Sequence, residues 1–283
     1  MNLSEPALII PDLHQDVYFL DKILAAENLD HFAAIVFLGD FYDPRRPECD
    51  DQSAIIGLTQ FLCQIIQSYG SKTKFIWGNH DYMLYQSRPY FISNSDSDDS
   101  VVSSGIIPEG ADAEDVALLK RWEFIHAVLP EGFWTHLDEF ALCGDWLISH
   151  AGIHPNYWDF SLAPHEALDA FRSNHTRLYK RAQATTAQTA PSGHAPTPPV
   201  SEEDDAFTAV GRARGGDAPA GGLLWLDWDA EFEDKLPFPQ IVGHTPQAYT
   251  GPVLTQSTHN VDYGQQAYGI LDQHTLHIKK TSS

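Results

Sequence analysis

The N-terminal part of the chain repeats one pattern, in which a short apolar run is followed by polar residues and then by an amphipathic segment. The apolar runs are Ala7–Pro11, Ala33–Leu38 and Thr73–Trp77. Apolar residues then return at helical spacing between Val17 and Leu24 after the first run, and between Ile55 and Ile66 after the second. Short strands that alternate with amphipathic helices predict an α/β fold.

The pattern changes toward β structure in the second half of the chain. Runs of strand length occur at Phe133–Leu137, Phe140–Leu142, Trp146–Ser149 and Gln240–Val242. The last part of the chain alternates between apolar and polar residues, which predicts antiparallel strands. We therefore expect a single domain over residues 1–283, with an α/β architecture that ends in strands.

One segment is unlike the rest because it cannot build a core. Between Ala182 and Asp205 the only large aliphatic residue is Val200, and alanine, threonine, proline and acidic residues dominate. Such a composition cannot bury enough apolar surface to offset the entropy of ordering the chain. We expect residues 182–222 to form a mobile insertion near the functional site, after a helix predicted over Ala163–Lys180.

The composition disfavours several classes of partner and compartment. The 17 Lys and Arg stand against 39 Asp and Glu, so the formal net charge is −22. A surface this negative repels a phosphate backbone and an anionic membrane alike. The scattered Cys49, Cys63 and Cys143 form neither a disulfide framework nor a C-x-x-C metal site. The sequence therefore predicts a cytoplasmic protein with no nucleic-acid partner and no membrane partner.

Polar clusters follow five of the predicted strands. They are Asp12-x-His14, Gly39-Asp40-x-x-Asp43, Gly78-Asn79-His80-Asp81, His150-Ala151-Gly152 and Gly243-His244-Thr245. A single histidine beside an apolar run is most often structural, but five clusters at equivalent positions indicate a shared site. In α/β folds, ligands bind beyond the carboxyl ends of the strands, where these clusters are expected to meet.

The residue types in these clusters suit divalent metal ions. Carboxylate, imidazole and amide oxygen together bind manganese, iron, zinc, cobalt or nickel, whereas calcium prefers oxygen alone. We expect two ions, with manganese as the first choice, that clamp a phosphoryl group and generate a bridging hydroxide nucleophile. The candidate ligands, with Asp40 shared between the ions, are Asp12, His14, Asp40, Asn79, His150 and His244.

An alkoxide leaving group also needs a proton. His80 can supply that proton if a carboxylate fixes its tautomer, and Asp43 in the neighbouring cluster is the candidate carboxylate. His80 and Asp43 are therefore the predicted catalytic acid pair of a phosphoester hydrolase.

The clusters resemble those of the calcineurin-like metallophosphoesterases, and in detail those of the phosphoprotein phosphatase branch, which includes diadenosine tetraphosphatases. Leu223–Trp225 (LLW) and Gly243–Gln247 (GHTPQ) are similar to motifs of that branch. The resemblance implies a four-layer αββα sandwich with two mixed central sheets. It also implies a first metal on Asp12, His14 and Asp40, a second on Asp40, Asn79, His150 and His244, and an acid pair of His80 and Asp43.

Some positions depart from the pattern that the chain resembles. Gln15 stands where the first motif usually has glycine, and the arginine that holds the substrate phosphate is displaced to Arg45. A second phosphate-binding arginine is expected after the LLW segment but is missing there, so that Arg212 and Arg214 of the glycine-rich stretch 211–216 become the candidates. Arginine suits bidentate phosphate binding, although a Gly/Arg loop can also be a solvated turn.

These observations favour a metal-dependent phosphomonoesterase of the phosphoprotein phosphatase type, acting on a phosphorylated protein or a small phosphoester. The same centre could instead hydrolyse dinucleoside polyphosphates or nucleotides, since it also cleaves anhydrides. A third interpretation, from another class, is a non-catalytic scaffold that keeps the fold for binding. That interpretation is disfavoured because the six ligands and the acid pair are all present.

Overall fold

The structure is a computed structural model that describes residues 6–49, 51–92, 113–130, 132–173 and 205–282. The helices are α1 (Val17–Ala26), α2 (Gln52–Tyr69), α3 (Asn79–Ile92), α4 (Ala113–Val128) and an unlabelled helix at residues 164–173. Within the described ranges, none of these helices is long and apolar enough to cross a membrane.

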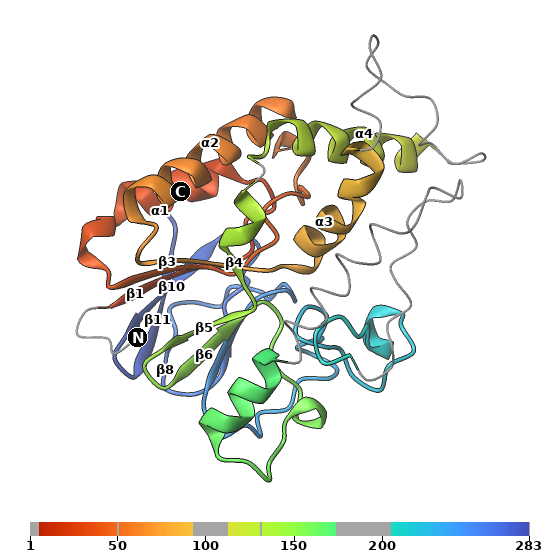
Figure 1. The fold of residues 1–283 in the computed structure, drawn as a ribbon. Helices are drawn as coiled ribbons and strands as arrows, with labels where there is room; N and C mark the ends of the chain where they lie inside the picture. The colour runs from red at the N-terminus through yellow and green to blue at the C-terminus, as the bar shows by residue number, and fades with distance from the viewer. Residues whose placement is uncertain (1–5, 50, 93–112, 131, 174–204, 283) are drawn as a thin grey trace.

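The strands form two mixed sheets (Figure 1). The seven-stranded sheet has the order β4-β3-β2-β1-β10-β11-β8, and the four-stranded sheet has the order β5-β6-β7-β9. Strands β1 to β4 are parallel, β10, β11 and β8 add antiparallel pairs, and β5 is antiparallel to β6 in the second sheet. The bounds are β1 (Ala7–Ile10), β2 (Ala34–Phe37), β3 (Thr73–Ile76), β4 (Leu137–Asp138), β5 (Phe140–Cys143), β6 (Trp146–Ser149), β7 (Gln240–Val242), β8 (Leu254–Thr255), β9 (His259–Asn260), β10 (Ala267–Asp272) and β11 (Thr275–Lys280).

The side chains of β1 explain why the sheets lie inside the molecule. Leu8 and Ile10 join the core beneath the helices, whereas Ala7 and Ile9 join the core between the two sheets. Because both faces of the strand are buried, it is apolar throughout. Figure 1 shows α1 and α2 on the outer side of the seven-stranded sheet and the green helix at residues 164–173 on the opposite side. The predicted four-layer sandwich with two mixed sheets is thus confirmed.

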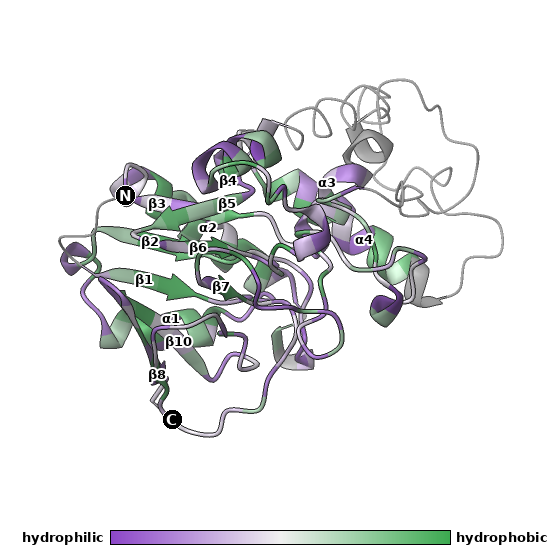
Figure 2. Cartoon of the chain, turned by 90° about the horizontal axis from the view of Figure 1, so that it is seen from below, coloured by the Kyte–Doolittle hydropathy of each residue, from purple (hydrophilic) through white to green (hydrophobic). Residues whose placement is uncertain are grey.

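The helices begin at residues that satisfy their free backbone N–H groups. Asp16 accepts a hydrogen bond from the N–H of Phe19 at the start of α1, and Asp51 accepts one from Ala54 at the start of α2. The buried side chains of α1 recur at helical spacing. The strands are drawn mainly in the hydrophobic colour in Figure 2, so the polar residues lie in the loops and on the outer helix faces.

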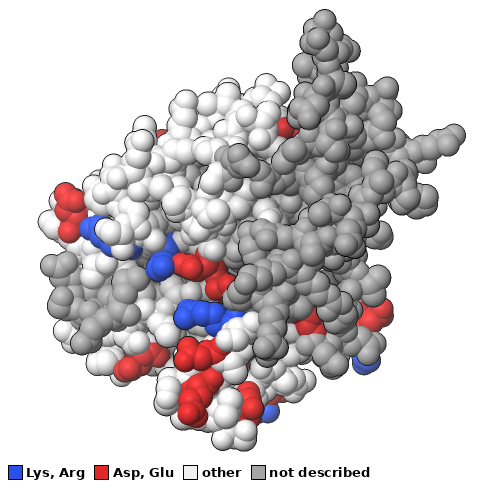
Figure 3. All heavy atoms as spheres, in the orientation of Figure 1, with Lys and Arg blue, Asp and Glu red and all other residues white. Residues whose placement is uncertain are grey.

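Figure 3 shows where charged side chains lie on one face of the molecule. Basic side chains on the face in Figure 3 are few, and each group of them lies close to acidic ones. On the described part of this face, the basic side chains therefore do not form a continuous positive patch of the kind that binds a phosphate backbone.

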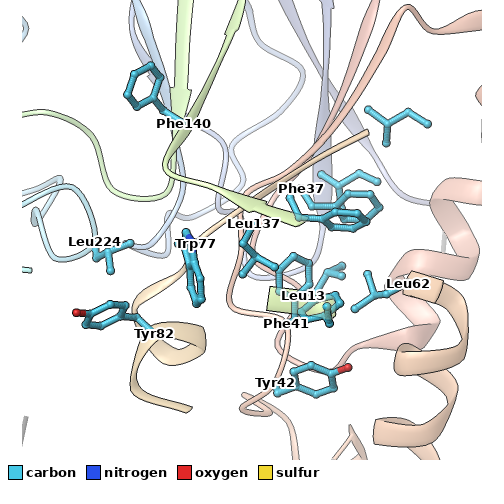
Figure 4. Packing of buried hydrophobic residues seen from close by; sticks show 14 of the residues in the cluster. Leu13, Phe37, Phe41, Tyr42, Leu62, Trp77, Tyr82, Leu137, Phe140 and Leu224 are labelled. Atoms are coloured by element: carbon cyan, nitrogen blue, oxygen red, sulfur yellow. The ribbon is translucent and has the colours of Figure 1, made fainter. Parts of the chain in front are cut away.

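Aromatic residues anchor the loops that carry the polar clusters (Figure 4). Phe41, next to Asp40, meets the ring of Phe133 at 5.8 Å, and Trp77, just before Gly78, stacks on Trp134 at 5.6 Å. Their side chains are nearly inaccessible to solvent. Packing beneath the loops therefore fixes the polar residues that point away from the core.

The strand predicted over Phe133–Leu137 is wrong for most of its length. Phe133–His136 is a 3-10 helix, and β4 has only Leu137 and Asp138. A strand would direct Phe133 and Trp134 to opposite faces, but the turn lets both enter the same aromatic cluster, where they contact Phe41 and Trp77.

The predicted insertion at residues 182–222 lies only partly within the described residues. Residues 182–204 fall outside them, as does the end of the helix predicted over Ala163–Lys180, which is helical at 164–173. Within 205–222, the side chains of Phe207, Ala209, Ala218 and Ala220 are buried. These buried side chains pack parts of 205–222 against the rest of the domain, and the mobility of the insertion stays a prediction.

Candidate metal centre

The loops after β1, β2 and β7 carry residues in the left-handed region of backbone space. The φ angles are +45° at His14, +48° at Asp40, +134° at Asp43 and +69° at His244. Such conformations cost about 1–3 kcal/mol each for a residue with a side chain and persist only where the surroundings impose them. One restraint is a hydrogen bond from the His14 N–H to the Asp40 carbonyl at 2.7 Å, which ties the first two loops together.

Two glycines allow the second and third clusters to touch. A Cβ atom added to Gly78 would lie 2.1 Å from Asp40 Oδ1, and one added to Gly39 would lie 2.4 Å from the Gly78 nitrogen. Gly39 also has a φ of +91°, which favours glycine. Across this close approach the His80 N–H donates to Asp40 Oδ1 at 3.1 Å.

Asp12, His14 and Asp40 form the first group of potential ligands. Their ligand atoms lie within 4.8 Å of one another, and His14 Nε2 is 3.6 Å from Asp40 Oδ2. His14 Nδ1 donates to the Asp43 carbonyl at 2.7 Å, so Nε2 carries a free lone pair. This Nε2 and Asp12 Oδ1 are buried and have no hydrogen-bond partner among the described residues.

The second group combines Asp40 with Asn79, His150 and His244. His150 Nδ1 donates to the carbonyl of Leu38 at 2.7 Å, which leaves the Nε2 lone pair directed at the cluster. That atom lies 2.9 Å from Asn79 Oδ1, 3.2 Å from His244 Nδ1 and 3.6 Å from Asp40 Oδ2. The His150 nitrogen and the two oxygens therefore lie close enough together to share one cation.

Burial keeps the three histidines neutral. It lowers the pKa of His14 to about 4 and lowers the pKa values of His150 and His244 as well. A neutral imidazole offers a lone pair to a metal ion, whereas an imidazolium does not. All three histidines are therefore prepared to act as ligands at neutral pH.

The pKa values of Asp12 and Asp40 shift in opposite directions, although both carboxylates are buried in the same cluster. Burial raises the pKa of Asp12, and the negative charges of Asp262 and Asp40 raise it further. Burial also acts to raise the pKa of Asp40, but the surrounding histidines, led by His150, bring it below its usual value. The buried negative charge is thus concentrated where the two groups of ligands share Asp40.

His80 and Asp43, the residues predicted to form an acid pair, lie in contact. His80 Nδ1 lies 2.9 Å from Asp43 Oδ2, and His80 Nε2 lies 4.0 Å from Asp40 Oδ2. Burial acts to lower the pKa of His80, but Asp40 and Asp43 outweigh it and raise the pKa to about 9. The His80 side chain is 37% exposed, so it borders the cluster on the solvent side.

Arg45 turns back to the cluster although it is displaced along the sequence. Its Nη1 donates to Asp262 at 2.8 and 3.1 Å, and its Nη2 is 3.5 Å from Asp12 Oδ2. The Arg45 side chain is 25% exposed, while both carboxylates are buried. One edge of the guanidinium group is therefore engaged with acids, and part of it faces solvent.

Of the other two candidate arginines, Arg214 is fixed near the cluster. Its Nε is 2.8 Å from Asp227 Oδ2, and one Nη donates to Thr245 Oγ1 at 2.8 Å. Its positive charge contributes to the lowered pKa of His244. Arg212 is exposed, and no interaction among the described residues connects it to the six ligands. Of the two, only Arg214 is placed beside the candidate centre.

Gln15 and Asp81 hold the loops that carry the clusters in place through hydrogen bonds to their backbone. The Gln15 amide donates to the carbonyls of Cys49 and Asp51, so the residue at the usual glycine position links the first loop to the start of α2. Asp81 accepts from the backbone N–H groups of Phe41 and Gly78 at 2.9 and 3.1 Å. Neither side chain belongs to the two ligand groups.

The sequence reasoning assigned no role to Asp262, Asp227 or Thr245. Asp262 follows the end of β9 by two residues, which is the same signal that singled out Asp12 and Asp40. Asp227 carried no such signal. Thr245 belongs to the cluster that follows β7, but its partner could not be predicted, because the roles of both residues depend on the position of Arg214.

The residues present fit two divalent cations. The first group offers two carboxylates and an imidazole, the second offers a carboxylate, two imidazoles and an amide oxygen, and Asp40 belongs to both. Unpartnered buried acceptors such as His14 Nε2 cost free energy unless a cation or water satisfies them. This mixed nitrogen and oxygen set suits manganese, iron or zinc.

The chain belongs to the calcineurin-like phosphoesterase family, whose model matches residues 6–248. Membership implies phosphoester hydrolysis, and the family generally uses two divalent metals.

A solved structure of low sequence identity shares the fold. A cold-active protein tyrosine phosphatase, solved as a point mutant, is 13% identical over 98% of this chain and 80% of its own length, with a TM-score of 0.51. A metallophosphoesterase from Sphaerobacter thermophilus is 13% identical over 99% of this chain and 89% of its own, with a TM-score of 0.40. No curated protein matches the sequence.

Proposed function

We propose that the protein is a dimetal-dependent phosphomonoesterase that acts on a phosphorylated protein or a small phosphoester. The observation that supports this most directly is the meeting of buried acceptors from five strand ends beside the 2.9 Å contact between His80 and Asp43. A cation site next to a positioned acid is the combination that phosphoester hydrolysis requires.

In this proposal Asp12, His14 and Asp40 hold one ion, and Asp40, Asn79, His150 and His244 hold the other. Manganese is the first candidate for both positions. Two bound divalent ions would supply the charge that polarises a phosphoryl group and lowers the pKa of a water molecule. The role of the chain itself is to orient the ligands, through bonds such as that of His150 Nδ1 to the Leu38 carbonyl.

His80 supplies the proton that the leaving oxygen needs. Because Asp43 accepts from Nδ1, the proton that is transferred is the one on Nε2, which lies on the side of Asp40. General acid catalysis of this kind contributes typically about 10²–10⁴ in rate.

Arg45 and Arg214 bind the phosphoryl oxygens that the cations do not. Arg45 is oriented by two acids, and Arg214 by Asp227 and the Thr245 hydroxyl. Part of each side chain remains exposed, 25% for Arg45 and 28% for Arg214. A fixed, planar donor group loses little entropy when it binds a phosphate. The second anchoring partner of each arginine, Asp12 for Arg45 and the Thr245 hydroxyl for Arg214, thus favours specific binding over a merely solvated turn.

The test is an assay of the purified protein with manganese, iron, zinc or magnesium against four substrates: phosphoserine peptide, phosphotyrosine peptide, diadenosine tetraphosphate and a phosphodiester. We expect a phosphomonoester to be preferred by about tenfold or more, which is about 1.4 kcal/mol of transition-state discrimination. Asp12→Asn and His80→Asn should each abolish manganese-dependent turnover of a phosphopeptide.

Two other outcomes would replace the proposal. A preference of that size for diadenosine tetraphosphate would identify a dinucleoside polyphosphate hydrolase instead. A protein that binds no metal and turns over none of the four substrates would be a binding scaffold that keeps the fold.

A further inference from the structure

Arg45 lies between two buried carboxylates, of which only one belongs to the candidate metal ligands. Nη2 is 3.5 Å from Asp12, and Nη1 reaches both oxygens of Asp262. Asp262 is fully buried and comes from the loop after β9, 217 positions from Arg45. A fully buried carboxylate is rare unless it is paired, so this ion pair is an integral part of the folded structure.

Asp262 is itself held in place from several sides. Its N–H donates to Asn260 Oδ1 at 2.9 Å, its carbonyl accepts from the Gln247 N–H at 2.7 Å, and its Oδ1 accepts from the Gly264 N–H at 3.1 Å. The same loop reaches the first ligand group, because Gln265 Nε2 donates to the Asp12 carbonyl at 3.0 Å. Asp262 is therefore a rigid support rather than a mobile surface acid.

The charges explain why the support is needed. Without Asp262, the long Arg45 side chain would have only the 3.5 Å contact with Asp12 to fix it, and any cation held by Asp12 would repel the guanidinium group. Asp262 offsets that repulsion from a position that is not among the six ligands.

We propose that Asp262 is a positioning residue, which holds the Arg45 guanidinium against Asp12 so that a phosphate bound by Arg45 is fixed relative to the first cation site. The inference rests on the proposed phosphoesterase function and assigns a role to a residue outside the ligands and the acid pair. Asp262 touches Arg45 and not the substrate, so it acts on substrate binding and not on the proton transfer by His80.

The experiment measures inorganic phosphate binding to the manganese-loaded protein by calorimetry, together with KM and kcat for a phosphopeptide. Asp262→Asn keeps the shape and removes the charge, so the Kd for phosphate and the KM should both rise about tenfold or more, as expected for a lost charge-assisted contact. kcat should change far less, and the manganese stoichiometry should remain two. Arg45→Lys keeps the charge but not the planar donor group, so it should weaken the binding of phosphate to a similar extent.

Arg45→Ala and the double variant Arg45→Ala/Asp262→Asn provide the decisive comparison. If Asp262 acts through Arg45, the double variant should bind phosphate as weakly as Arg45→Ala alone. Asp138→Asn is the matched control, because it breaks the 2.8 Å Lys74–Asp138 pair on the edge of the seven-stranded sheet and should leave phosphate binding unchanged.

Either of two results would overturn the proposal: an unchanged phosphate Kd in Asp262→Asn with the fold intact by circular dichroism, or fully additive effects in the double variant. Phosphate and manganese binding are measured without turnover. If the phosphopeptide is not hydrolysed but Asp262→Asn still weakens phosphate binding, the proposed phosphomonoesterase function is wrong while the positioning role of Asp262 stands.

Discussion

Asp43 serves two histidines at once: its carboxylate lies 2.9 Å from His80 Nδ1, and its backbone carbonyl accepts a 2.7 Å hydrogen bond from His14 Nδ1. The unusual φ of +134° at Asp43 is part of this arrangement. One strained residue on the loop after β2 therefore orients both the candidate acid and a candidate ligand of the first cation, which places the acid at a set position relative to that cation.

Replacing Asp43 with asparagine removes the carboxylate that holds His80 and helps to raise its pKa. We expect Asp43→Asn to lower kcat/KM for a phosphoserine peptide by at least about tenfold, within the range of general acid catalysis. Hydrolysis of p-nitrophenyl phosphate should be slowed much less, because its leaving group needs no proton. Equal slowing of the two substrates would show that Asp43 acts through the fold or the metal ligands and not through proton transfer.

Divalent metal should stabilise the folded protein strongly, because it satisfies buried acceptors such as His14 Nε2 that have no other partner. Manganese at a hundred times its Kd adds about 2.7 kcal/mol to the free energy of unfolding for one site. Differential scanning fluorimetry with and without manganese measures the effect. His150→Gln should lose most of the shift, whereas His126→Gln should keep it, because His126 bonds to Leu84 and Ser87 outside the cluster. A full shift in His150→Gln would exclude His150 as a ligand.

The local pattern predicts the ligands because each follows a strand. Asp12, Asp40 and Asn79 follow neighbouring parallel strands of the seven-stranded sheet, whose carboxyl ends meet at one edge. His150 follows β6 of the four-stranded sheet, and strand periodicity alone does not predict that the two sheets bring their ends together. The same reasoning applies to His244 after β7.

The supporting interactions could not be read in this way, because they join residues far apart in the chain. Arg45 and Asp262 are 217 positions apart, and neither local pattern indicates the other. Residues 205–222 look polar and glycine-rich, yet Phe207 is buried among residues that lie elsewhere in the sequence. The 3-10 helix at Phe133–His136 likewise depends on tertiary packing, which overrides local strand propensity.

The cysteines should differ in reactivity according to their burial. Burial raises the pKa of Cys143 to about 11 from 9.0, so its thiolate fraction near neutral pH is roughly a hundredfold below that of a free thiol. Because the thiolate is the reactive form, labelling of Cys143 in the folded protein should become appreciable only as the pH approaches 11. With a disulfide reagent at pH 8, Cys63, which is half-buried on α2, should react first. Cys63→Ser should lose this fast phase, and a fast phase that persists would contradict the order.

Gly78→Ala tests whether the close approach of the second and third loops is required for metal binding. The added Cβ would lie 2.1 Å from Asp40 Oδ1 and 2.3 Å from the Asp40 nitrogen, so Asp40 must move from its position between the two ligand groups. Overpacking of this kind costs typically about 1–3 kcal/mol, which urea unfolding of the metal-free protein measures. Manganese titration of the same variant should show weakened binding at both sites, because Asp40 is common to them.

Gly132→Ala is the matched control. The φ of Gly132 is −77° and an added Cβ meets nothing within 4 Å, so both stability and manganese affinity should be preserved. If Gly78→Ala binds manganese as tightly as the unchanged protein, Asp40 is not the shared ligand.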